Sequence, residues 1–204
     1  SEGALGPSLD FQNQLVQKGN VGGSAFKFPN TVYNAAGGYL SICAGIKGYN
    51  VTVTNGAQSG LQSVAYAMQV MRNGWEDAML ATGTDENSAI ISELYHGLGL
   101  VADTHVLPYE GKKQFSLSDG SISLLTETEA SANARGARVY CHIAGYGMAH
   151  ESVPFGTVKG SGQGLANAIS SAFVDAGVRP EEIDAVIGFA NGEGSVDAAE
   201  AEGL

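Results

Sequence analysis

Short apolar runs alternate with segments of helical periodicity along most of the chain. The runs are apolar, often β-branched and bounded by turn-forming residues, which predicts strands at 51–54, 77–83, 121–127, 137–147 and 183–190. Apolar residues three and four apart predict helices at 61–71, 86–98 and 165–173, and another helix at 196–204. The third of these is expected to end at Gly177 and Pro180. Such alternation favours an α/β fold with a largely buried sheet.

The composition fits one sizeable domain or two small ones, with 44% hydrophobic and 15% charged residues among 204. Small and polar residues at 130–136 form a seam between two strand–helix sets, so we divide the chain into 1–136 and 137–204. We see no apolar stretch long enough for a membrane helix and no signal peptide at the start. Two cysteines make no disulfide framework, and a reducing cytoplasm is the default location.

The net charge of −11, from 21 acidic and 10 basic residues, makes nucleic acid a poor partner, because such binding needs clustered basic side chains. The nearest basic cluster is Lys112 with Lys113, which we interpret as a solvated loop. We expect no metal and no cofactor, since the histidines lack ligand spacing and neither H-E-x-x-H nor C-x-x-C occurs. Loop or surface positions are expected for all four: His96, His105, His142 and His150.

Several short motifs follow one another in a characteristic order. They are N-A-A-G at 34–37, G-Y-N at 48–50, S-G-L at 59–61, R-N-G at 72–74, P-Y-E at 108–110, R-G-A at 135–137, G-Y-G at 145–147 and N-G-E-G-S at 191–195. In this order they resemble the β-ketoacyl synthase family of condensing enzymes, whose stretches read P-F-D and H-G-T-G-T at the P-Y-E and N-G-E-G-S positions. The resemblance runs from about Gly6 to the last residue.

The resemblance implies the thiolase fold, in which two similar halves pack as alternating α and β layers. Residues 1–136 would then be the later part of the N-terminal ketosynthase half, and 137–204 the start of the C-terminal half. Opening strands, the family's catalytic lysine and its second histidine would be missing. Because half a sheet exposes unpaired edges, we expect folding to need segments of a longer protein or of another chain.

The family's nucleophile turn reads S/T-x-C-x-S-G-L, between a strand and a helix whose N-terminus lowers the pKa of the cysteine thiol. Alignment on Ser59-Gly60-Leu61 puts Ala57 at the cysteine, and a one-residue slip puts Gln58 there. Neither a methyl group nor an amide can accept an acyl group. We interpret Ser59 as a first-turn residue that satisfies backbone N–H groups. The remaining thiols, Cys43 and Cys141, are expected to be buried as small apolar residues.

A second replacement concerns the family's first active-site histidine. Matching N-G-E-G-S to H-G-T-G-T puts Asn191 at this position, whereas an ungapped match from Asp197 puts Phe189 there. The family's two histidines polarise the malonyl thioester and stabilise the enolate, and neither replacement carries an imidazole. Asp197 and Glu200 match an acidic pair of the family, and we expect them to N-cap the last helix and pair with a base.

Two losses on an intact scaffold are typical of chain-length-factor subunits, which lack the cysteine and form a heterodimer with an active ketosynthase in fatty acid, polyketide or polyene assembly. The interface would include a helix at 34–45 and the strand at 51–54. Acyl carrier proteins are acidic like this chain, so we expect carrier contact only through the partner. Three alternatives stay open: a synthase active in its own right, a malonyl-carrier decarboxylase, which the loss at Asn191 disfavours, and a scaffold unrelated to acyl chains.

Overall fold

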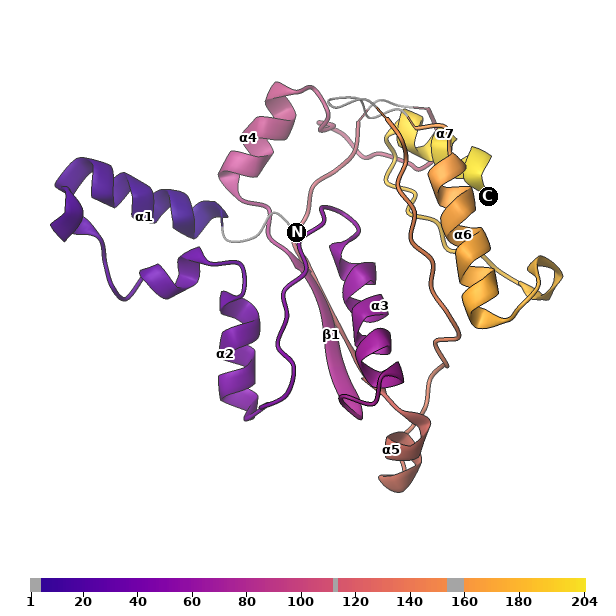
Figure 1. Ribbon diagram of the computed structural model, residues 1–204. Helices are drawn as coiled ribbons and strands as arrows, with labels where there is room; N and C mark the ends of the chain where they lie inside the picture. Colours follow the sequence, from indigo (N-terminus) through magenta and orange to yellow (C-terminus); the bar gives the residue numbers. More distant parts are fainter. Residues whose placement is uncertain (1–4, 112–113, 154–159) are drawn as a thin grey trace. The chain divides into compact units, whose positions relative to one another are not determined.

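The computed structural model describes residues 5–111, 114–153 and 160–204, which form two compact units. The first unit contains residues up to 92 together with 118–140, and the second contains 93–117 together with 141–204 (Figure 1). Each unit therefore gathers segments that are distant in the sequence.

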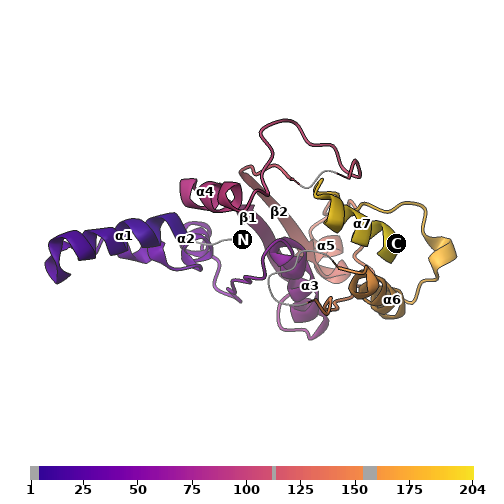
Figure 2. The ribbon, with the colours of Figure 1, turned by 90° about the horizontal axis from the view of Figure 1, so that it is seen from above.

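An antiparallel strand pair and one helix form the centre of the first unit. Strand β1 (Ala78–Asp85) pairs with β2 (Gly120–Glu127) over their full lengths. Helix α3 (Ser59–Arg72) packs along one side of the pair (Figure 2). The helix buries small and apolar side chains in its C-terminal half, namely Ala65, Ala67, Met68 and Val70, as expected for an amphipathic helix.

Two glycines bring α3 close to β1. A Cβ atom added to Gly83 would lie 3.2 Å from the Cα atom of Gly60, at the N-terminal end of the helix. This spacing is tighter than ordinary van der Waals contact, so a side chain at Gly83 would press on the helix, whereas a Cβ atom at Gly60 would make an ordinary contact of 3.7 Å with the Cα atom of Gly83. The absence of a side chain at Gly83 therefore lets the beginning of α3 lie close to the strand.

The remaining elements of the first unit cover little of one another. They are α1 (Leu5–Lys18), two short 3₁₀ helices (Asn20–Gly22 and Phe28–Thr31), α2 (Ala35–Ala44) and α5 (Glu129–Ala134). The second 3₁₀ helix lies against α1 through the rings of Phe11 and Phe28, whose centroids are 5.6 Å apart. No residue of α1 or α2 is buried, so neither helix contributes to a hydrophobic core in the described residues.

The second unit is built around two helices, α6 (Gln163–Ala176) and α7 (Gly194–Gly203), which lie side by side (Figure 1). A Cβ atom on Gly203 would lie 2.6 Å from the carbonyl oxygen of Gly162, so the helices meet through glycine backbone. A 3₁₀ helix, Pro180–Glu182, follows α6. Helix α4 (Ala89–Gly97) begins in the first unit and ends in the second.

The structure confirms the predicted helices and two of the predicted strands. Helices α3, α4, α6 and α7 and strands β1 and β2 lie at the predicted places, and α6 ends at Gly177, which adopts the left-handed conformation with φ +67°. The helix expected at 34–45 is α2. Helix α5 occupies the seam that the composition indicated at 130–136.

Three predicted strands are wrong: residues 51–54, 137–147 and 183–190 form no strand. A strand exists only where a neighbouring strand takes its N–H and C=O groups, and the described residues supply no such neighbour for these segments. The three segments have the apolar composition of strands, but no described strand lies beside them to accept and donate their backbone hydrogen bonds.

The expected burial of the sheet is also wrong. In the β1–β2 pair only Ala81 and Thr126 are buried, and Ile122 is 71% exposed. The physical reason is that α3 packs mainly over β1 and leaves most of β2 uncovered. Among the described residues, no helix combines the length and apolar content required to cross a membrane.

Candidate functional site

The turn before α3 is held by a serine hydroxyl. Ser59, which is 7% exposed, accepts a hydrogen bond from the backbone N–H of Asn55 at 2.7 Å through its Oγ. The same hydroxyl donates to the carbonyl oxygen of Gly56 at 2.7 Å, and Gly56 has a φ of +57°. The chain thus reverses direction over Asn55–Gln58 and enters the helix at Ser59, as predicted for a first-turn serine.

The two residues aligned with the family nucleophile lie at the exposed part of this turn. Ala57 and Gln58 are both exposed, and Gln58 occupies the N-cap position of α3 without a side-chain capping bond. A methyl and an amide therefore stand in front of a helix N-terminus, where a thiol would be activated by the helix dipole. The only hydroxyl in this turn belongs to Ser59 and is engaged in the turn itself.

Both cysteines are free and exposed, so the expectation that they pack in a core is wrong. Cys43 belongs to α2, which has no buried residue, and Cys141 follows β2 in the segment that was expected to be a strand. Their exposure has the same cause as that of the sheet, because no described layer covers either segment. The four histidines are exposed, as predicted, and Nε2 of His96 lies 3.9 Å from Oδ1 of Asp103.

The G-Y-N motif before the turn has a structural explanation. Asn50 donates through Nδ2 to the carbonyl oxygen of Gly37 at 3.1 Å and to the Ser41 hydroxyl at 3.3 Å, which holds this segment against α2. A Cβ atom on Gly48 would lie 2.5 Å from Oε1 of Glu76, the same oxygen that accepts from the N–H of Tyr49. The motif therefore anchors the strand-like segment that leads to the nucleophile turn.

The second candidate region is the loop that precedes α7. Asn191 accepts a hydrogen bond from the backbone N–H of Glu193 at 2.9 Å through its side-chain oxygen. Glu193, which is 6% exposed, N-caps the helix by accepting from the backbone N–H groups of Ser195 at 3.0 Å and Val196 at 2.9 Å. Sequence reasoning assigned the cap to Asp197 and missed Glu193, because glutamate is not among the residues preferred at this position.

The acidic pair Asp197 and Glu200 binds backbone N–H groups in the described part of the chain, and its expected pairing with a base stays a prediction. Asp197, only 2% exposed, accepts from the N–H of Gly192 at 3.2 Å and of Tyr109 at 2.6 Å. Glu200 accepts from the N–H of Phe189 at 2.5 Å and from that of Ala190 at 2.9 Å. Both side chains project from α7 toward backbone N–H groups of Tyr109 and of the 188–192 loop, which are their hydrogen-bond donors.

A tyrosine that sequence reasoning did not single out joins this network. The Tyr109 hydroxyl donates to Oε2 of Glu200 at 2.8 Å. Partial burial would raise the pKa of Glu200, but the N–H groups of Ala190 and Phe189 and the Tyr109 hydroxyl together hold this pKa below its ordinary value. The hydrogen bond to Glu200 in turn raises the pKa of the Tyr109 phenol, and burial and the negative charges of Glu200 and Asp197 add to the effect.

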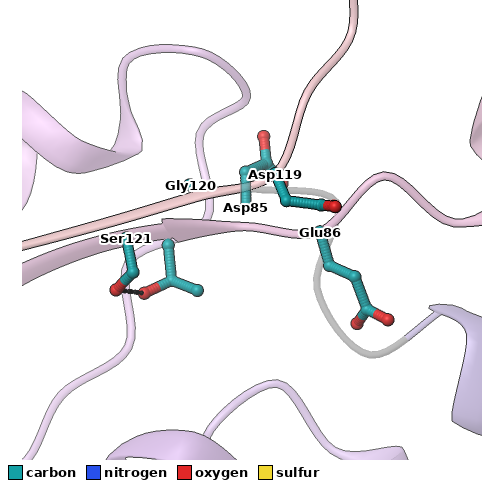
Figure 3. A pocket seen from close by; sticks show the side chains of 6 residues that line it. Asp85, Glu86, Asp119, Gly120 and Ser121 are labelled. Atoms are coloured by element: carbon teal, nitrogen blue, oxygen red, sulfur yellow. Dashed lines mark hydrogen bonds between the residues drawn. The ribbon is translucent and has the colours of Figure 1, made fainter.

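An acidic depression at the end of the strand pair is a weaker candidate. It is open to solvent and is lined by Thr84, Asp85, Glu86, Asp119, Gly120 and Ser121. Figure 3 shows Glu86 extending away from the Ser121 hydroxyl, which lies 2.8 Å from that of Thr84. Asp119 accepts from the N–H of Asn87 at 2.5 Å. No group of His, Cys, Asp and Glu side chains in the described part of the chain could hold a metal ion.

Comparison with models of protein families identifies the family of this chain. The model of the β-ketoacyl synthase N-terminal domain matches residues 5–129, and the model of the C-terminal domain matches residues 140–204. This chain belongs to the β-ketoacyl synthase family. The family resemblance inferred from the motifs is therefore confirmed.

The curated relatives of this β-ketoacyl synthase chain are much longer than the chain itself. A 3-oxoacyl-[acyl-carrier-protein] synthase 2 of Vibrio cholerae is 29% identical over 198 residues, which are 93% of this chain and 48% of the relative. The protein of the same name in Staphylococcus aureus is 30% identical over 83% of this chain and 44% of its own length. The chain thus spans about half the length of the curated relatives it matches.

Solved structures show the fold. A structure of a type II polyketide synthase acyl-carrier protein in complex with its ketosynthase matches with a TM-score of 0.87 at 19% identity, over 98% of this chain and 53% of the other. The ishigamide ketosynthase/chain length factor matches with a TM-score of 0.80 at 24% identity, over 97% and 51%. The fold is therefore the α/β thiolase-like fold of ketosynthases, and the chain covers part of it, as predicted.

Proposed function

We propose that this chain is part of a ketosynthase-like subunit that does not elongate acyl chains, of the chain-length-factor type. One observation carries the proposal: the turn before α3, which the motif order aligns with the family's nucleophile turn, offers the methyl group of Ala57 and the amide of Gln58. An acyl group cannot be transferred to either side chain. The turn is thus retained as scaffold.

The nearby hydroxyl does not replace the missing thiol. Ser59 is buried, and its Oγ both accepts from Asn55 and donates to Gly56. A nucleophilic serine needs a base that removes its proton, whereas this proton is shared with a carbonyl oxygen. Asn191 at the position of the first histidine supports the same reading, because an amide neither takes up nor releases a proton near neutral pH.

We propose an active ketosynthase as the partner of this subunit, in a heterodimer. Helix α2 supports this, because its apolar side chains Tyr39, Leu40 and Ile42 are 49%, 43% and 78% exposed and need a covering surface. One matching structure contains a ketosynthase in complex with its acyl-carrier protein, and another is a ketosynthase/chain length factor. The net charge of −11 favours carrier docking on the partner rather than on this chain. The cytoplasmic location and the division at residue 136 stay predictions.

Acyl labelling tests the proposal. The protein with its natural flanking sequence is incubated with radiolabelled acyl-carrier thioester, and the bound label is measured after denaturation. We expect no label on the wild-type protein and a labelled band with a cysteine-bearing ketosynthase from the same organism. A stable adduct mapped to Ser59 or to either cysteine contradicts the proposal.

Two matched variants identify the nucleophile position. Ala57→Cys and Gln58→Cys place a thiol on neighbouring residues of the same exposed turn. If the ungapped alignment is correct, only Ala57→Cys gains label, because only that thiol stands where this alignment puts the family's cysteine. Label on Gln58→Cys alone would move the nucleophile position to residue 58 and support the slipped alignment.

The names of the curated relatives favour one alternative, a 3-oxoacyl-carrier synthase that is active in its own right. This alternative requires condensation by the purified protein alone, and the label experiment decides it. Decarboxylation of malonyl-carrier thioester without condensation would support the malonyl-carrier decarboxylase instead. Purification in a one-to-one complex with a full ketosynthase is the result that we expect from the proposed function, and a stable homodimer contradicts it.

A further inference from the structure

Tyr109 reaches α7 with two separate groups. Its backbone N–H donates to Oδ2 of Asp197 at 2.6 Å, and its hydroxyl donates to Oε2 of Glu200 at 2.8 Å. Asp197 and Glu200 are three residues apart on the helix, so they present their carboxylates on one face. One residue of the segment between α4 and β2 is thereby fixed at both its main chain and its side chain.

The same two carboxylates hold the loop that carries Asn191. Asp197 accepts from the N–H of Gly192 at 3.2 Å, and Glu200 accepts from the N–H groups of Phe189 and Ala190. The hydroxyl of Tyr109 and the N–H of Ala190 bind the same oxygen, Oε2 of Glu200. Tyr109 is therefore one of the three donors that hold this carboxylate, and the other two belong to the loop backbone.

The backbone on both sides of this contact is in an unfavourable conformation. Tyr109 has a φ of +61° and Ala190 a φ of +47°, the two positive values found outside glycine in the described residues. Such conformations persist only where the surroundings impose them. A Cβ atom on Gly188 would lie 2.8 Å from the Tyr109 hydroxyl oxygen, so the loop leaves room for this hydroxyl.

The conformation of the loop decides which atom Asn191 offers. The backbone N–H of Glu193 must donate to oxygen, so the 2.9 Å contact identifies the near atom of the Asn191 amide as Oδ1. The NH₂ group is then the part of the side chain that is left to act as a donor.

We propose that Tyr109 is a positioning residue, which acts through Glu200 and Asp197 to hold the 188–192 loop and to fix the orientation of the Asn191 amide. The proposal rests on the proposed function only in aligning Asn191 with the family's first histidine. The contacts themselves exist whether or not the protein transfers acyl groups.

The test uses Tyr109→Phe in the isotope-labelled protein with its natural flanks, since this change removes the hydroxyl and keeps the ring and the backbone bond. We expect amide hydrogen exchange at Phe189 and Ala190 to become about tenfold faster, from the loss of one charge-assisted hydrogen bond. The side-chain NH₂ resonances of Asn191 should shift or broaden. Tyr140→Phe, at an 82% exposed tyrosine of the other unit, is the matched control and should change neither signal.

A pH titration tests the hydrogen bond from Tyr109 to Glu200 separately from the exchange rates and the Asn191 signal. Among the described residues, Tyr109 donates to Glu200, and the charges of both Glu200 and Asp197 act on the Tyr109 phenol. Because the Tyr109 hydroxyl is one of the groups that lower the pKa of Glu200, its removal should move the midpoint of the Glu200 carboxyl resonance to higher pH. If Tyr109→Phe matches Tyr140→Phe in exchange, in the Asn191 signal and in this midpoint, the proposal is overturned.

A measurement on the wild-type protein covers the case in which Tyr109→Phe does not fold. The ring carbon resonance next to the Tyr109 oxygen should titrate with the midpoint of Glu200, because the phenol donates to that carboxylate. A Tyr109 resonance that does not follow Glu200 refutes the contact. Acyl label on the wild-type protein would end the proposed function and leave these signals unchanged, so the two failures are distinguishable.

Discussion

Replacing Ser59 with alanine removes the hydroxyl that holds the turn before α3. Two hydrogen bonds of 2.7 Å are lost, one from the N–H of Asn55 and one to the carbonyl oxygen of Gly56. At about 0.5–1.5 kcal/mol for each hydrogen bond, the loss amounts to roughly 1–3 kcal/mol. Asn55 and Gly56 are exposed, so water can form hydrogen bonds with the N–H and C=O groups that lose the Ser59 hydroxyl. We therefore expect the free energy of unfolding to decrease by about 1–2 kcal/mol.

The assay is equilibrium unfolding in urea, with Ser63→Ala as the matched control in the same helix. Ser63 makes a single bond of 2.7 Å to the carbonyl oxygen of Gly60, in the next turn of α3. Its removal should cost below about 0.5 kcal/mol, because alanine is also the better helix former. Equal midpoints for the two variants would refute the argument that Ser59 is the residue that holds the turn.

Two further predictions concern the second unit. Gly192→Ala should lower the free energy of unfolding by about 1–3 kcal/mol, because Gly192 has a φ of +90° and a Cβ atom would overlap Cγ1 of Val106. The control is Gly97→Ala, since Gly97 has open space around it, and equal urea midpoints for the two variants would contradict the reasoning. Hydrogen bonds from a serine hydroxyl and two backbone N–H groups lower the pKa of Glu151, so its contribution is present above the ordinary pKa of 4.5 and is lost as the pH falls through the lower folded-state pKa. Thermal melts at a series of pH values should therefore show a shallower acid limb for Glu151→Gln than for the wild type, whereas the exposed Glu202→Gln should follow the wild type.

Elements that depend on their own residues could be predicted from the sequence. The spacing of apolar residues located α3 and α6, and Gly177 ended α6 because glycine adopts the left-handed conformation at low cost. Helix α1 was missed, although its partner Phe28 lies nearby in the chain. Its apolar positions are few, and its contacts form with a 3₁₀ turn that has no periodicity of its own.

Some residues of the candidate site could likewise be found from the sequence, and others only from the structure. The positions of Ala57 and Asn191 came from motif order, since both lie inside short stretches whose neighbours keep the family pattern. The role of Tyr109 could not come from the sequence, because Glu200 is 91 residues away and no local pattern joins them. The assignment of Asp197 as a helix cap failed because Glu193 already takes the N–H groups that a cap would bind.

By itself, the sequence determined the family, the order of the main helices and the absence of a sulfur atom at the turn before α3, because these depend on residue identity and on spacing within one segment. Only the tertiary structure decided which apolar segments pair as strands and which carboxylate binds which N–H group. Strand pairing and hydrogen-bond partners are properties of two segments at once, and a pattern read along one segment contains no information about the other.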